Sequence, residues 1–327
     1  EEGVPIVFQQ NDPRMNVPRN KCADVMKWVA DQCDLVKDVL PFRYSNENEN
    51  WGRVNGAAAY ALKARALLYR ASKLNNPDGN TAYWANAAQA AADFITQNNK
   101  QSYPYRLYNT GNPENDYYEC FTTNPVYNNE IILARSVWNT NQVEKVFLPV
   151  GFTGSFSGNG RTNPTQNLVD AYEMSNGKRI DENGSTYDAA NPYKDRDPRL
   201  AQTIFYQGMM WGRADKEERR AIDVRYNSDA DKGVDYTSAM GGTYTGYYLK
   251  KFVNNISCKE PATYPHAWMI FRYGEILLNA AEAYNEAEGP AKAYSYINEV
   301  RARAGMPAYA DMSQSELLSL IHISEPT

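Results

Sequence analysis

The stretch Phe271–Pro307, FRYGEILLNAAEAYNEAEGPAKAYSYINEVRARAGMP, carries the clearest structural signal in this chain. Its first half has residues at alternating spacings of four and three, namely Tyr273, Leu277, Ala280 and Tyr284. This spacing places them on one face of an α-helix. Gly289-Pro290 ends that helix and begins the next, because proline is tolerated in a first helical turn and not in a helix interior. We predict an αα-hairpin over 271–304 whose alanine-rich seam packs against neighbouring helices.

Three further helices are expected before residue 100. A helix over 53–74 carries small residues along one face, namely Ala57, Ala61, Ala64, Leu68 and Ala71. The next helix has the same spacing at Trp84, Ala88, Ala91 and Ile95. A helix over 21–39 has an apolar stripe that we expect in the core, formed by Cys22, Val25, Val29, Cys33, Val36 and Leu40. Small residues serve helix–helix contact, so we interpret the alanine seams as bundle core rather than as a partner-binding groove.

From 101 to 269 the helical periodicity mostly fails. The stretch is rich in Tyr, Asn, Gly and Pro, which favour turns, and short strand-like pieces such as 130–134 interrupt it. A long irregular region in a compact domain is more often a binding surface than a linker. The predicted fold class is therefore mainly α, with tetratricopeptide-like helical hairpins forming a scaffold and a large irregular loop-rich region carrying short strands.

Composition excludes several classes of function. The chain has 327 residues and a formal net charge of −5, which argues against a nucleic-acid-binding surface. No apolar run approaches the roughly 20 residues that a membrane-spanning helix needs. The aromatic content is high, with 25 Tyr and 6 Trp, whereas there are only 2 His. These numbers describe a globular protein with an aromatic-rich surface or core.

Catalytic and metal motifs are missing from the sequence. Nucleophilic triads usually need a positioned His, and His266 is the one candidate outside the C-terminal tail. Asp195 and Asp197 alternate with arginines, so we interpret them as a turn held by ion pairs rather than as a glycosidase acid pair. We predict no catalytic residue, no cofactor and no metal site, and leave open whether a structural calcium binds. Pairing of Cys120 with Cys258 also stays open.

Several strings together resemble one family. Arg272–Glu286 reads R-Y-x-E-I-L-L-x-x-A-E-A-x-N-E, and Ile297–Pro307 reads I-N-x-V-R-x-R-A-G-x-P. With P-T-x-x-L-V-D-A-Y at 164–172, R-D-P-R-L at 196–200 and T-G-Y-x-x-x-K-F at 245–252, the chain resembles the SusD/RagB family of Bacteroidetes outer-membrane nutrient-binding lipoproteins. The resemblance implies a single SusD-like domain over 1–327 that is incomplete at both ends. Its parts would be a helical part (1–99), a loop-rich binding region (100–270), the hairpin (271–307) and a truncated or artefactual end (312–327).

The resemblance also implies a function. A protein of this family would be non-catalytic and would lie on the outward-facing side of the outer membrane. There it would capture oligosaccharides or polysaccharides for a SusC-like TonB-dependent transporter. The membrane would be reached only through a lipid anchor outside this sequence. A peptide-binding member of the family and a tetratricopeptide-type scaffold that binds other proteins remain alternatives, and a glycoside hydrolase is a third.

Candidate ligand residues come from composition, because the family's ligand residues lie outside its shared motifs. A flat aromatic ring covers the C–H face of a pyranose, while polar side chains bond its hydroxyls. The segment 205–213 and the later Tyr244 offer this mixture. We predict ligand contacts by Tyr206, Trp211, Arg213 and Tyr244, and expect the glycines beside Trp211 to leave its ring exposed.

Overall fold

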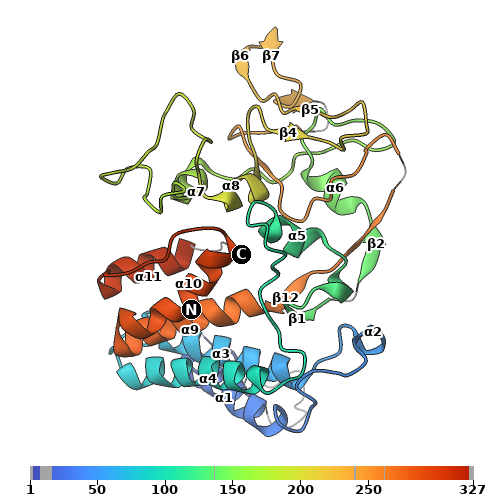
Figure 1. Ribbon diagram of the computed structural model, residues 1–327. Coiled ribbons are helices and arrows are strands. Elements are labelled where there is room, and N and C mark those ends of the chain that lie inside the picture. The colour runs from blue at the N-terminus through green and yellow to red at the C-terminus, as the bar shows by residue number, and fades with distance from the viewer. Residues whose placement is uncertain (1–2, 8–16, 136, 239–240, 261, 324–327) are drawn as a thin grey trace.

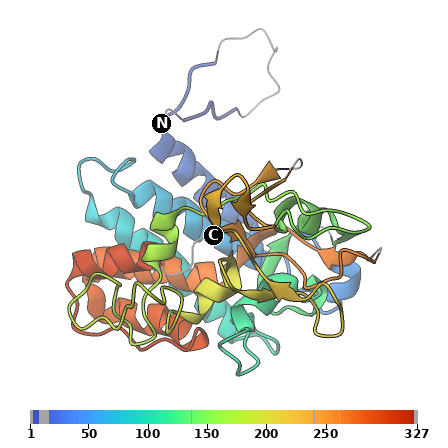
Figure 2. The same ribbon diagram turned by 90° about the horizontal axis from the view of Figure 1, so that it is seen from above.

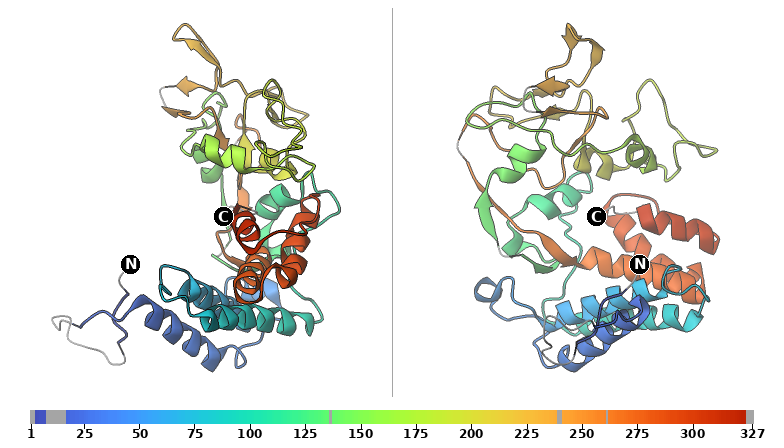
Figure 3. Two further views of the ribbon diagram at one scale, coloured as in Figure 1. Left: turned by 90° about the vertical axis from the view of Figure 1, so that its left-hand side faces the viewer. Right: turned by 180° about the vertical axis from the view of Figure 1, so that it is seen from behind.

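The computed structural model describes residues 3–7, 17–135, 137–238, 241–260 and 262–323. Figure 1 shows two parts, which we call the helical layer and the loop-rich lobe. The helical layer contains α1 (Cys22–Val36), α3 (Gly56–Ala71), α4 (Thr81–Asn99), α9 (Tyr273–Glu288), α10 (Pro290–Arg303) and α11 (Gln314–Ile323). The loop-rich lobe is formed by residues 101–269 and lies above this layer in Figures 1 and 3. The mainly α fold class is confirmed.

The alanine seams form the core of the helical layer. Residues of the predicted seam on α3 are all at most 5% exposed, namely Ala57, Ala61, Ala64, Leu68 and Ala71. On α4, Ala88 and Ala91 are buried and pack with α9 residues Ala280 and Ala283. Because alanine lets helix backbones approach closely, three helices share one tight seam. The interpretation of these faces as bundle core is confirmed.

Local signals fix where these helices begin and end. Asn55 caps α3, since its side-chain oxygen accepts a hydrogen bond from the Ala58 amide at 2.8 Å. Gly289 separates α9 from α10 with a φ of +89°, a backbone conformation that favours glycine. At α11 the Ser313 amide donates to Glu316 at 2.8 Å and the Glu316 amide donates to the Ser313 hydroxyl at 3.3 Å. This reciprocal pair is a capping box.

The predicted core stripe of the first helix is only partly correct. In α1 the buried residues are Ala30 and Cys33, whereas Val36 is 43% exposed. The reason is position, because α1 lies at the outer side of the helical layer and packs mainly against α3 (Figure 3, left). All four cysteines are free thiols. Cys120 and Cys258 belong to different core clusters, so the structure does not pair them.

The loop-rich lobe contains short helices and two-stranded pairs. Its helices are α5 (Asp116–Thr122), α6 (Gln142–Phe147), α7 (Gln166–Ala171), α8 (Pro198–Thr203) and the 3-10 turn η1 (Pro125–Tyr127), while the small α2 (Glu47–Asn50) precedes α3. The strands of the described residues pair two by two: β1 (Ile131–Ala134) with β12 (Met269–Arg272), β2 (Trp138–Thr140) with β11 (Tyr264–His266), β3 (Ile204–Phe205) with β10 (Tyr248–Leu249), β4 (Met210–Trp211) with β5 (Arg220–Ala221), β6 (Tyr226–Ser228) with β7 (Asp231–Lys232) and β8 (Thr237–Ser238) with β9 (Gly241–Gly242). Every pair is antiparallel.

The lobe has its own apolar core. This cluster gathers residues from distant loops, including Leu148, Phe205, Trp211, Tyr248 and Val253. A smaller cluster joins α7 to α8 through Val169 and Leu200. Seen from above in Figure 2, the red C-terminal helices and the green segment around α6 lie at opposite sides of the molecule.

The start of α7 differs from what an Asn-Pro sequence suggests. Asn163 would be the N-cap on that pattern, but Thr165 occupies the position and its hydroxyl accepts from the Leu168 amide at 3.3 Å. The Asn163 amide group instead donates to the carbonyl oxygens of Gly160 and Tyr247, at 3.1 and 3.3 Å. Asn163 therefore ties the start of α7 to the loop before β10 rather than capping the helix.

Candidate functional site

A large cavity lies where the end of α10 meets the loop-rich lobe. Its volume is about 400 Å³, within the range of roughly 300–1,000 Å³ typical of ligand pockets. Its wall includes Tyr193, Asp195 and Tyr206 from the lobe, Glu114 from the loop before α5, and Gly305 just after α10. Segments that are far apart in the sequence thus line the same cavity.

Two tyrosines form a stacked pair in this wall. The rings of Tyr193 and Tyr206 lie 4.0 Å apart with an interplanar angle of 20°. Both side chains are partly buried and pack against the cluster that contains Leu200 and Ile204. Burial raises the pKa of the Tyr206 hydroxyl and of the Tyr193 hydroxyl. The pair thus gives the cavity wall two aromatic side chains, each with a hydroxyl group.

Two exposed carboxylates, those of Glu114 and Asp195, line the cavity, and neither is held in a close ion pair among the described residues. Glu114 is exposed and has no hydrogen-bond or ion-pair partner among the residues that the structure describes. The nearest cation to Asp195 is Lys194, at 3.9 Å, and both side chains are well exposed. Asp195 has a φ of +52°, an uncommon conformation for a residue with a side chain. Its own carbonyl accepts from the Ser175 amide at 2.8 Å, which fixes this part of the wall.

The charged side chains next to Asp195, those of Arg196 and Asp197, stabilise the fold. Asp197 caps α8 by accepting from the Arg199 amide at 2.9 Å, and its carboxylate meets the Arg199 guanidinium at 2.6 Å in a buried pair. The Arg196 guanidinium donates to three backbone carbonyls, those of Pro192, Val169 and Tyr172, at 2.7–2.8 Å. The interpretation of this segment as a turn held by ion pairs is confirmed for Asp197, which pairs with Arg199, whereas Asp195 has only the exposed Lys194 nearby.

An arginine of α10 holds the cavity wall in place. The Nη1 atom of Arg301 lies 2.8 Å from Oε2 of Glu173, and the Tyr309 hydroxyl donates to Oε1 at 2.6 Å. The Glu173 carbonyl in turn accepts from the Asp197 amide at 2.8 Å. Glu173 thus connects α10 to the segment that carries Asp195.

A second buried carboxylate, that of Glu130, also joins the helical layer to the loop-rich lobe. Glu130, fully buried beside β1, accepts from Arg272 at 2.7 Å and from Arg303 at 3.2 Å. Arg301 and Arg303 belong to the V-R-x-R part of the family-like string, and Arg272 begins the other part. These motif arginines therefore join the helical layer to the loop-rich lobe.

Gly305 lets the loop before α5 approach the end of α10. Its φ is +71°, and a Cβ atom at this position would lie 2.9 Å from the Cβ of Pro113. Only glycine accommodates both the backbone conformation and the contact. Because Pro113 precedes Glu114, this contact also places the backbone of Glu114 near the end of α10.

The structure separates the four predicted ligand residues. Tyr206 lines the cavity, whereas Trp211, Arg213 and Tyr244 are not among its lining residues. Arg213 pairs with Asp215 at 2.7 Å on the surface, and Tyr244 is 98% exposed on a loop. The ligand roles of these residues stay predictions.

Trp211 is buried rather than exposed. It is 6% exposed, and its ring meets those of Phe205 and Tyr118 edge to face at 4.8 and 6.2 Å. The adjacent Gly212 has a φ of +108°, and a Cβ there would lie 2.8 Å from the Cα of Arg219. The glycine is thus needed for close approach of the chain at β4 and β5, and does not create open space beside the indole.

The cavity also contains residues that sequence reasoning misses as ligand candidates. Tyr193 and Glu114 are not among the predicted ligand residues, and Asp195 is predicted only as part of a turn. The available signal is the position of Tyr193 and Asp195 beside the R-D-P-R-L string, since family-like strings and irregular loops meet there. No spacing rule connects Glu114 to them.

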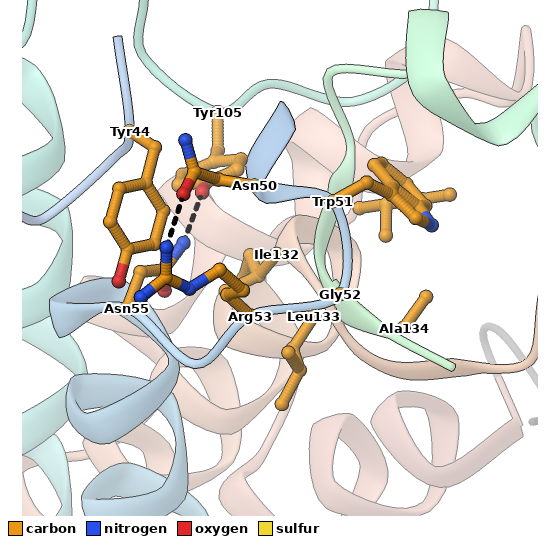
Figure 4. Close-up of a pocket in the computed structure, with 11 residues that line it drawn as sticks. Tyr44, Asn50, Trp51, Gly52, Arg53, Asn55, Tyr105, Ile132, Leu133 and Ala134 are labelled. Atoms are coloured by element: carbon orange, nitrogen blue, oxygen red, sulfur yellow. Dashed lines mark hydrogen bonds between the residues drawn. The ribbon is translucent and has the colours of Figure 1, made fainter. Parts of the chain in front are cut away.

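The second cavity lies beside β1 and is shown in Figure 4. Tyr44, Trp51 and Arg53 line it, and Arg53 donates to Asn50 at 2.8 Å. Its volume is about 30 Å³, which is room for a few water molecules and not for a sugar ring. We interpret it as a packing defect between the α2 loop and β1.

Metal binding and membrane crossing find no support in the described part of the chain. No group of three or more His, Cys, Asp or Glu side chains there is arranged to hold a metal ion. Nor is any described helix sufficiently long and apolar to cross a membrane.

Comparison with known proteins identifies the family. A sequence model described as the SusD family matches residues 96–323, which is more than half of the chain. The chain belongs to the SusD family. No curated protein matches it.

Solved structures of SusD-like proteins have the same fold. A SusD-like protein from Bacteroides fragilis matches with a TM-score of 0.75 and 23% identity, covering 98% of this chain and 61% of that one. A SusD-like carbohydrate-binding protein from the same species gives 0.74 and 21%, covering 99% and 59%. The surface glycan-binding protein A from Bacteroides uniformis gives 0.58 and 18%, covering 99% and 59%. At these identities the likeness shows the fold alone.

The chain corresponds to only part of each of these solved structures, so the function of a whole SusD-like protein is not assigned to it by the match. This SusD-family chain spans about 60% of the length of the three solved structures, as 61%, 59% and 59% of them are covered. No catalytic family is indicated by these matches.

Proposed function

We propose that this SusD-family chain is part of a non-catalytic surface protein that binds oligosaccharides in the cavity lined by Tyr193 and Tyr206. The observation that carries the proposal is the stacked tyrosine pair in a cavity of about 400 Å³ beside Glu114 and Asp195. Aromatic rings pack against the C–H face of a sugar, and carboxylates accept hydrogen bonds from its hydroxyls. Both groups occur together in this cavity.

The pair is suited to hold a ligand with little rearrangement. The ring of Tyr206 is supported on one face by Tyr193, and the Tyr193 ring meets Tyr247 edge to face at 6.4 Å. A supported ring loses little conformational freedom when a sugar packs against it, which favours affinity. The cavity wall is further fixed through Glu173 by Arg301.

The rest of the proposal concerns location and partner. We propose that the protein is held at the outward-facing surface of the outer membrane by a lipid anchor outside this sequence, and passes glycans to a SusC-like TonB-dependent transporter. Family membership supports this. Individually weak contacts suffice, since a long glycan engages several surface proteins at once.

The proposal is tested by binding of the purified protein to polysaccharides. Isothermal calorimetry with a panel of neutral polysaccharides and of peptides would be run on the wild type, Tyr206→Ala and Tyr103→Ala. Tyr103 is 79% exposed and is not among the cavity residues, so it controls for the loss of a tyrosine elsewhere on the protein. Circular dichroism verifies that each variant is folded.

We expect binding to at least one glycan, weakened on the order of tenfold or more in Tyr206→Ala and unchanged in Tyr103→Ala. Binding of peptides alone would favour the peptide-binding alternative. A folded protein that binds no glycan and no peptide would contradict the proposal and favour a protein-interaction scaffold. Release of reducing sugar would indicate an enzyme.

A further inference from the structure

The charged residues of the cavity differ in how accessible they are to a ligand. Four charged residues line it: Glu114, Asp195, Arg196 and Asp197. Asp197 is neutralised by the buried contact with Arg199 at 2.6 Å. Arg196 is buried, and its terminal nitrogens are occupied by backbone carbonyls. The two carboxylates that remain available to a ligand are Glu114 and Asp195.

We infer that the cavity takes sugar rings that carry no carboxylate or sulfate, and that Glu114 and Asp195 impose this selection. The inference rests on the proposed glycan-binding function and deepens it by naming the class of ligand. Carboxylates accept hydrogen bonds from the hydroxyls of a neutral ring, but repel the carboxylate of a uronic acid or the sulfate of a sulfated sugar.

Two cations oppose this effect and are too weak to reverse it. Lys194 lies 3.9 Å from Asp195 with its side chain 73% exposed, and such exposed pairs interact weakly in water. Arg196 is 7% exposed, so its guanidinium has little surface for an anion. The formal net charge of the whole chain, −5, adds to the repulsion of an anionic polymer.

The size of the effect follows from elementary electrostatics. Two protein carboxylates, each about 6 Å from a ligand carboxylate in a water-like dielectric, lower its affinity by on the order of tenfold, and the positive charge of Lys194 beside Asp195 reduces this to roughly threefold. Because Glu114 and Asp195 are exposed to solvent, dissolved salt reaches these charges. At about 1 M salt the screening length is near 3 Å, so the ratio of affinities falls to about one.

The test compares matched pairs of polysaccharides that differ in charge. Pullulan, laminarin and galactomannan are measured before and after nitroxyl-catalysed oxidation, which converts the C6 hydroxymethyl group into a carboxylate on the same backbone. Arabinoxylan and glucuronoxylan supply a natural pair, and polygalacturonate and chondroitin sulfate supply purely acidic probes. Affinities are measured by calorimetry at low salt and at about 1 M salt.

A double variant connects the selection to the two residues. In Glu114→Gln plus Asp195→Asn the carboxylates become amides of the same shape, and asparagine tolerates the left-handed backbone conformation of position 195. The readout is the ratio of affinities for the neutral and the charged member of a pair. We expect a ratio of about three or more in the wild type, and a ratio of about one or less in the double variant, where the cations remain.

The possible outcomes distinguish failure of this inference from failure of the proposed glycan-binding function. A neutral glycan that binds about as tightly as its oxidised form at low salt, or an acidic probe that binds most tightly of all, would overturn this inference and leave the proposed function intact. A ratio unchanged in the double variant would overturn the assignment to Glu114 and Asp195. A folded protein that binds no probe would overturn the proposed function, and this inference with it.

Discussion

Nη1 of Arg301 lies 2.8 Å from Oε2 of Glu173, with side chains 1% and 5% exposed. One residue belongs to the last turn of α10 and the other follows α7 in the loop-rich lobe. Glu173 also accepts from Tyr309, and its carbonyl accepts from the Asp197 amide. The charge pair is therefore a direct connection between the helical scaffold and the wall of the proposed sugar site.

Removing one partner of this pair will destabilise the protein. Arg301→Met leaves the Glu173 carboxylate buried without its cation, which typically costs about 3–5 kcal/mol in the free energy of unfolding. The matched control is Lys178→Met, because the Lys178–Glu182 pair is exposed, with side chains 45% and 40% accessible. Its loss should cost under about 1 kcal/mol. Urea unfolding measures both, and equal costs would show that Arg301 does not act as a buried connection.

Trp211 will prove more important for stability than its predicted ligand role implies. Since it packs against Phe205 and Tyr118 in the lobe core, Trp211→Ala should lower the free energy of unfolding by about 3–5 kcal/mol. Trp211→Phe should cost less, because an aromatic ring remains in the cluster. Denaturant titration gives the stability, and glycan calorimetry is run on Trp211→Phe. A stable Trp211→Phe protein that has lost glycan binding would support ligand contact instead of packing.

The stability of the protein will rise with pH because of Lys250. Burial lowers the pKa of Lys250 from 10.5 to about 8. Between these values the unfolded chain binds a proton that the folded chain lacks, so the free energy of unfolding increases with pH across that window. Relative to Lys250→Met, the wild type should gain about 2 kcal/mol between about pH 7 and pH 10. Urea titrations of both proteins at each pH test this, and parallel pH profiles would contradict it.

Gly305 will be less tolerant of substitution than a glycine with similar backbone geometry. Gly79 has a φ of +66° with nothing within 4 Å of the place that a Cβ atom would occupy. Gly79→Ala therefore isolates the backbone cost, about 1 kcal/mol. Gly305→Ala adds a contact of 2.9 Å with Pro113, and should cost more. Thermal unfolding compares the two variants, and equal melting temperatures would show that the loop before α5 moves away without cost.

The helical scaffold is predictable because its signals are local. Seam residues such as Ala57 and Ala61 recur at helical spacing, and Gly289-Pro290 and the Ser313 capping box have physical meaning within a few residues. The exposed face of α1 is not predictable, since periodicity reveals an apolar stripe but not how many neighbours will cover it.

The candidate site is much harder to predict because it is assembled over long distances in the sequence. Glu114 and Gly305 are brought together by packing of α10 against a loop, and no spacing rule encodes that contact. Aromatic composition singles out Tyr206, which lines the cavity, whereas the flanking glycines mislead about the exposure of Trp211. A lobe with little regular structure uses large aromatic residues for its core as well as for its surface.

The proposed sugar site can be tested directly by a crystal structure of the protein with a neutral oligosaccharide that calorimetry has shown to bind. We predict a sugar ring in the cavity, packed against the Tyr193–Tyr206 pair, with its hydroxyls hydrogen-bonded to Glu114 or Asp195. A sugar bound elsewhere, for example on Tyr244 or against the helical layer, with the cavity empty, would contradict the proposal.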